Sequence, residues 1–212
     1  MATTSIRNML RLYRATITAV NERLAETLGD LRDEAEEWCR ERSAVARLPL
    51  LAWMAWIGLR HLVDGDYQSW FKPLTLGLHE AGHLLFGWLP FAFLMVAGGT
   101  LLQLVAPIAT AFMFARQPDW FGVTVAGAWL GDSLYDVALY MADARELDLP
   151  LVTVGDGECF DVCHDWHYML REVGLLSADT TLAFLVRVVA FAVLWASVAA
   201  GAWMLWRMTR SR

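Results

Sequence analysis

The segment His79-Glu80-Ala81-Gly82-His83 has the residue types and spacing of a metal-dependent hydrolase. On a helix, positions four residues apart share one face, so the two imidazoles can bind one zinc ion together. Glu80 lies between them and provides a carboxylate that can take a proton from a zinc-bound water. The surrounding stretch is apolar, where ionisable side chains are costly and usually have a function. The pattern predicts His79 and His83 as zinc ligands and Glu80 as the catalytic base.

The composition is that of a membrane protein rather than an ordinary soluble domain. Hydrophobic residues make up 57% of the 212 residues, 11 residues are tryptophan, and the mean hydropathy is +0.39. The net charge of −6 and the scattered basic residues give no basis for binding nucleic acid. The odd number of cysteines, 3, does not suit a disulfide framework, and the N-terminal stretch lacks the apolar core of a cleavable signal. Membrane entry is therefore expected to depend on internal segments.

An amphipathic helix is predicted for residues 6–38. Apolar residues recur there at intervals of three and four with charged residues between them, and Gly29-Asp30 is expected to break or bend the helix. Its one apolar seam suits three arrangements: lying on a membrane, pairing with a second copy of the chain as a dimer, or packing on the protein's own cytosolic face. The chain is therefore divided into an amphipathic N-terminal helical region, residues 1–47, and a membrane-embedded helical domain, residues 48–212.

Apolar runs in the second region predict an all-α, polytopic membrane helix bundle with 4 to 5 spans. The runs cover residues 48–63, 74–89, 91–115, 120–141 and 182–206. The first run has about 16 residues, whereas a span usually needs about 20. Arginines precede the first run and follow the last, so the positive-inside rule favours two cytoplasmic ends and an even number of crossings. The expected location is the inner membrane of a bacterium.

A catalytic zinc normally has three protein ligands and one open position, so the motif needs a partner from elsewhere in the chain. The segment His164-Asp165-Trp166-His167 contains two more of the five histidines. His164 is the expected third ligand and His167 an alternative, while Asp165 is expected to orient a ligating imidazole through a hydrogen bond. In the competing interpretation, Asp165 and these imidazoles only cap the helix that begins here.

A second source of ligands is the acidic stripe formed by Asp132, Asp136 and Asp143 on the fourth apolar run. At about 100° per residue, these positions fall within about 40° on a helix. Carboxylates inside a membrane usually look into a bundle or a water-filled cavity. Asp143 and Asp136 are therefore alternative zinc ligands, and Asp132 and Asp136 are expected to orient the ligating histidines or to pair with Arg187.

A separate structural zinc site is an alternative use of the same loop. Cys159, Cys163, His164 and His167 could close around one ion, although their spacing is looser than that of a zinc knuckle. In an extracytoplasmic loop, the two cysteines could instead be oxidised to a disulfide.

The motif helix, followed by a carboxylate-bearing helix, resembles the site-2 protease-like intramembrane zinc metallopeptidases. This resemblance implies that His79, His83 and an aspartate of a later helix hold zinc and that Glu80 activates water. The later aspartate departs from the family's L-D-G context, because this chain has Leu130-Gly131-Asp132 in that region.

The chain is also similar to a group of small bacterial membrane proteins that share the H-E-x-x-H helix and have no assigned substrate. The shared segments are residues 77–83, 98–104, 140–145 and 164–166. This similarity covers roughly residues 74–176 and favours His164 and Asp143 over Asp132 as site residues.

Together these patterns predict a membrane-embedded zinc-dependent hydrolase, with a peptidase as the first choice. The expected substrate is a membrane protein or a lipid-linked amide. Two other classes stay open: a non-catalytic scaffold or assembly protein stabilised by zinc, and a metal transporter. Transporters with a similar motif carry a second histidine-rich helix, which this sequence lacks. Glu80 separates the classes, because a structural zinc site tolerates Glu80→Gln and a hydrolase does not.

Overall fold

The computed structural model describes residues 2–40, 42–149 and 164–210, and these residues form helices and no strand, as predicted. The helices are α1 (Ala2–Cys39), α2 (Leu48–Val63), α3 (Lys72–Phe86), α4 (Ala92–Arg116), α5 (Trp120–Ala142), α6 (Asp165–Glu172) and α7 (Asp179–Arg210), with a 3-10 helix, η1 (Leu176–Ala178), before α7. Cys159 and Cys163, and with them the alternative structural zinc site, lie outside the described residues.

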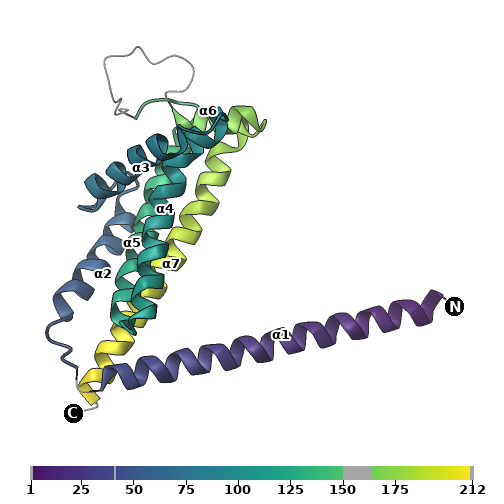
Figure 1. The fold of residues 1–212 in the computed structure, drawn as a ribbon, viewed down its shortest axis with the longest axis vertical. Coiled ribbons are helices and arrows are strands. Elements are labelled where there is room, and N and C mark those ends of the chain that lie inside the picture. Colours follow the sequence, from purple (N-terminus) through teal and green to yellow (C-terminus); the bar gives the residue numbers. More distant parts are fainter. Residues whose placement is uncertain (1, 41, 150–163, 211–212) are drawn as a thin grey trace.

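The central helix of the bundle is α5, which runs alongside α4 and α7 (Figure 1). Small residues allow this close packing: a Cβ on Gly131 would lie only 2.6 Å from the Cβ of Leu194 on α7. Asp132 and Asp136 on α5 are both buried. Because the neighbouring helices enclose them, these carboxylates do not lie on the exposed apolar surface of the bundle.

Two stretches, α4 and the helical segment from η1 through α7, are long and apolar enough to cross a membrane. By contrast, α2 and α3 have 16 and 15 residues. At about 1.5 Å per residue, neither reaches across the hydrocarbon core of about 30 Å. The prediction of four or five spans is therefore not confirmed, and length and composition identify two candidate membrane spans among the described residues.

The helix predicted for residues 6–38 is confirmed as α1, which projects sideways from the lower end of the bundle (Figure 1). Only its last turns are buried, where Trp38 and Cys39 join the same core cluster as Met208 of α7. The expected break at Gly29-Asp30 is wrong, because α1 continues through it. Strong helix formers surround Gly29, and no atom lies within 4 Å of where its Cβ would be, so nothing forces a bend.

The helix with the H-E-x-x-H motif, α3, meets α4 backbone against backbone. A Cβ on Gly82 would lie 2.2 Å from the carbonyl oxygen of Gly98, and a Cβ on Gly98 would lie 2.8 Å from the carbonyl oxygen of Gly82. Small residues permit such close helix contacts. This contact presses the motif against α4 and determines how near the two histidines lie to that helix.

We therefore predict that Gly82→Ala destabilises the protein by about 1–3 kcal/mol, because backbone atoms must move to admit one methyl group. Gly77→Ala is the matched control on the same helix, since no atom lies within 4 Å of its Cβ position. This control should be neutral or stabilising by up to about 1 kcal/mol. Thermal unfolding in detergent, followed by circular dichroism, measures both. Equal midpoints for the two variants would contradict the close contact.

Candidate metal centre

His79, His83 and Asp165 form one group whose potential ligand atoms all lie within 4.8 Å of one another. The Nε2 atom of His79 is 2.7 Å from Oδ2 of Asp165, and the Nε2 atom of His83 is 3.2 Å from the same oxygen. Two imidazoles and one carboxylate are ligands that bind divalent transition metals. The group can therefore hold a metal ion.

The other ring nitrogen of each histidine meets a fixed hydrogen-bond acceptor. Nδ1 of His79 lies 3.0 Å from Oε1 of Gln103, whose own amide nitrogen donates to the carbonyl oxygen of Ser133. Nδ1 of His83 lies 3.0 Å from the carbonyl oxygen of Met95. Because both partners accept, both Nδ1 atoms carry a proton, and the two Nε2 atoms remain for a metal. Metal-binding histidines in proteins are held in this way.

Gly99 on α4 leaves the space that the two Nε2 atoms face. A Cβ at this position would lie 2.7 Å from Nε2 of His79 and 2.6 Å from Nε2 of His83. Any side chain would therefore fill the space between the ligand nitrogens. The missing side chain and the donor set together fit a metal ion.

Asp165 reaches the histidines because His164, rather than Asp165, caps the start of α6. The backbone N–H of His167 donates to Nδ1 of His164 at 3.1 Å. Asp165 is then the first residue of the helix, and its backbone N–H donates to the hydroxyl oxygen of Tyr140 at 3.1 Å. With its backbone held in this way, the Asp165 side chain extends towards α3.

His164 is buried beside this group and does not join it. Its Nδ1 accepts the capping hydrogen bond, so its Nε2 carries the proton and donates to Oδ2 of Asp143 at 3.2 Å. Burial lowers the pKa of His164, which agrees with a neutral ring. Asp143 also accepts hydrogen bonds from the backbone N–H groups of Asp148 and Leu149. These two predicted ligand candidates therefore contact each other beside the metal group, where Asp143 holds the backbone that follows α5 and His164 caps α6.

The other predicted candidates have partners elsewhere. Nδ1 of His167 donates to the carbonyl oxygen of Ala144 at 2.7 Å. Asp132 pairs with His61 at 2.8 Å and with Ser69, and Asp136 pairs with Lys72 at 3.2 Å. The acidic stripe of α5 is thus buried on one side of the helix, as its spacing predicted. However, Asp132 and Asp136 contact their own basic partners and not the ligand histidines.

Glu80 follows His79 in the chain and is partly buried. Within the part of the chain that the structure describes, its carboxylate has no hydrogen bond or ion pair. Its negative charge nevertheless contributes to the raised pKa of His83, which places it near that ring. Glu80 is therefore a carboxylate close to His83 that has no partner among the described residues.

The charges of the three ligands depend strongly on each other. The hydrogen bond with Asp165 raises the pKa of His83 to about 9, although burial opposes this. Burial raises the pKa of Asp165, but the hydrogen bonds from His79 and His83 outweigh it and hold that pKa below its usual value. Without a metal, the group is therefore an imidazolium paired with a carboxylate.

Two residues that complete this centre were not predicted as site residues. Gln103 orients His79, and Gly99 leaves the space between the ligand nitrogens. The signals were an amide and a pair of glycines within an otherwise apolar run. Such residues on a membrane helix usually face another helix or a polar group.

Comparisons with family models, with curated proteins and with solved structures found no match to this chain.

We predict that Asp165→Asn lowers metal affinity by about 10-fold or more, since it removes an anionic ligand from the group. Asp136→Asn is the matched control, because this carboxylate is equally buried and pairs with Lys72 instead. Metal content of purified protein, measured by mass spectrometry after dialysis against a weak chelator, compares the variants with the parent. Loss of metal from Asp136→Asn and retention by Asp165→Asn would assign the third ligand to α5.

Metal affinity should also rise with pH up to about pH 9. A metal needs the neutral imidazole, so below its pKa His83 must release a proton, and affinity changes by up to about 10-fold per pH unit. The stability of the metal-free protein should instead fall as the pH rises. The raised pKa of His83 adds stability that is fully present below about pH 6.5 and is lost between about pH 6.5 and 9. Titration with zinc at several pH values tests this, and a pH-independent affinity would contradict it.

Proposed function

We propose that the protein is a membrane-embedded zinc-dependent hydrolase, with a peptidase as the first candidate. The observation that carries this proposal is a group of three potential ligands, His79, His83 and Asp165, with Glu80 next to His79 in the chain. Structural zinc sites usually have four protein ligands, whereas catalytic sites have three and keep one position open. Among the described residues, this centre offers three donors, which supports the second kind.

The residues of the centre suit hydrolysis of an amide or an ester. Zinc, when bound, supplies a Lewis acid that polarises a carbonyl and makes water acidic near neutral pH. Glu80 would take a proton from water and deliver it to the leaving group. Gln103 and the carbonyl oxygen of Met95 keep the two imidazoles in orientation during this transfer.

The surface of the protein supports a location in a membrane. Large apolar side chains on α4 and α7 are exposed, among them Leu101, Ile108, Phe112, Phe184, Val188 and Phe191. A soluble monomer rarely exposes contiguous apolar surface on this scale. Lipid chains would cover α4 and α7, and both are long and apolar enough to span the bilayer.

Exposed apolar side chains follow the motif in the chain and support a lipophilic substrate. His83 is only half-buried, Leu84 and Leu85 are 73% and 61% exposed, and Trp88 is 90% exposed. An exposed tryptophan among leucines is typical of a surface at the membrane interface. We therefore propose a segment of a membrane protein, or a lipid-linked amide, as the substrate.

Glu80→Gln should keep its metal and lose about 10²- to 10⁴-fold in hydrolytic rate, because the amide cannot accept the proton. The probe is detergent-solubilised membrane from the expression host, and mass spectrometry counts new peptide N-termini after incubation with parent or variant. His167→Ala serves as the comparison outside the ligand group. If Glu80→Gln keeps full metal and the same cleavage, the metal only fixes the fold, and the scaffold interpretation replaces the hydrolase.

A further inference from the structure

Helix α1 has an apolar face that is not covered by any part of the chain that the structure describes. Six side chains on this seam are between 41% and 65% exposed: Tyr13, Ile17, Val20, Leu24, Leu28 and Leu31. Soluble helices usually bury such a face against a partner. The seam needs a covering surface about as long as the helix itself.

The direction of the seam is set by its buried end. At about 100° per residue, all six exposed positions lie within an arc of about 80° that also contains Ala35 and Trp38. Ala35 and Trp38 are buried, together with Cys39, where this helix meets the bundle. The exposed seam therefore points to the same side as the bundle, and the acidic residues of α1, such as Glu22 and Glu26, point away from it.

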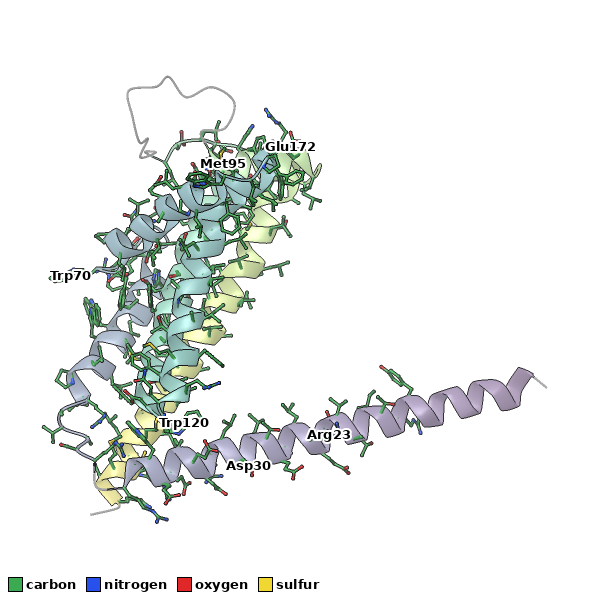
Figure 2. All side chains as sticks on the ribbon, in the orientation of Figure 1. Arg23, Asp30, Trp70, Met95, Trp120 and Glu172 are labelled. Carbon is green, nitrogen blue, oxygen red and sulfur yellow. The ribbon has the colours of Figure 1, made fainter. Side chains whose placement is uncertain are left out.

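The helix also runs across the axis of the bundle, as Figures 1 and 2 show. If α4 and α7 cross a membrane, a helix in this orientation lies parallel to the membrane surface. With its seam turned to the bundle side, its apolar residues meet the lipid that surrounds the bundle. Pairing with a second copy would instead require the seam to turn away from the lipid.

Basic residues gather at the end of the bundle next to α1. Arg47 precedes α2, Arg116 ends α4, and Arg207 and Arg210 lie in the last turn of α7. Arg42 and Arg47 lie over the ring of Trp38, at 4.3 and 5.0 Å from its centroid. Arginines gathered at one end of a bundle are typical of a surface that faces anionic headgroups.

The opposite end of the bundle contains the metal centre. In Figure 2, Met95 and Glu172 lie at that end, and Trp120 lies at the end near α1. The end that contains the metal centre has fewer arginines, and one of them, Arg145, is paired with Asp179 at 2.8 Å. The two ends therefore differ in charge in the way that distinguishes cytoplasmic from non-cytoplasmic membrane surfaces.

We propose that α1 lies in the headgroup region of the cytoplasmic leaflet, held by its apolar seam and by anionic phospholipids, and that the metal centre opens at the opposite membrane face. This inference rests on the membrane location proposed above and not on hydrolytic activity. Its consequence is that water and the substrate reach Glu80 from the non-cytoplasmic side.

Site-directed spin labelling of the full chain tests the placement of α1. The three cysteines are changed to alanine, and single cysteines are introduced at Val20 and Leu24 on the seam and at Glu22 and Glu26 opposite it. The variants are reconstituted into vesicles of phosphatidylcholine and phosphatidylglycerol. Labels on the seam should lie about 5–10 Å below the headgroups and be accessible to oxygen, whereas labels opposite should be accessible to a water-soluble nickel reagent.

Two results would overturn the placement. Equal nickel accessibility at all four positions would mean that α1 lies in water. Protection of the seam together with a spin-spin distance of about 10 Å would mean that a second copy covers it. Vesicles of phosphatidylcholine alone separate the contribution of the apolar seam from that of the anionic lipids. In these vesicles, only the electrostatic part of the binding of α1 should be lost.

Limited trypsin digestion of the unmodified chain tests the orientation and does not depend on the cysteine-free variant. In inverted membrane vesicles, trypsin should cut after Arg14 or Arg23 of α1 and spare Arg145 and Arg171, and in right-side-out vesicles the pattern should reverse. Cleavage at both ends from one side would contradict the orientation. Carbonate extraction separates the failures, because release into the soluble fraction would contradict the membrane location itself.

Discussion

One carboxylate oxygen, Oδ2 of Asp165, lies between the Nε2 atoms of His79 and His83, and the placement of α6 against α3 depends on this contact. Without a metal, a positive imidazole and a negative carboxylate stabilise each other there, which is the condition under which buried charge is tolerated. With a metal, the same atoms become ligands. The contact also joins α6 to α3.

The central helix α5 divides its polar residues between two tasks. Near its middle, Asp132 and Asp136 pair with His61 and Lys72 and so attach α2 and the start of α3 to the bundle. Near its end, Tyr140 and Asp143 hold the backbone and the cap of α6. One helical face therefore both builds the bundle and supports the centre, which explains why carboxylates occur on a helix otherwise made for burial.

Sequence periodicity predicted the all-helical fold, the amphipathic N-terminal helix and the buried acidic stripe, because these depend on local spacing. The spacing of residues in the sequence could not identify the third ligand. His164 and Asp165 are adjacent and both suit a metal, and the choice depends on which of them caps α6, a property of backbone geometry. Gly99 and Gln103 act through the packing of α4 on α3, which becomes visible only in three dimensions.

The most direct test of the assigned centre is X-ray absorption at the zinc edge on purified, zinc-loaded protein. Ligation by His79, His83 and Asp165 predicts two imidazole nitrogens and oxygen ligands at about 2.0–2.2 Å, with no sulfur. A sulfur shell at about 2.3 Å would place the metal on cysteine, and a third imidazole would place it on His164 or His167. Either result would contradict the centre described by this structure.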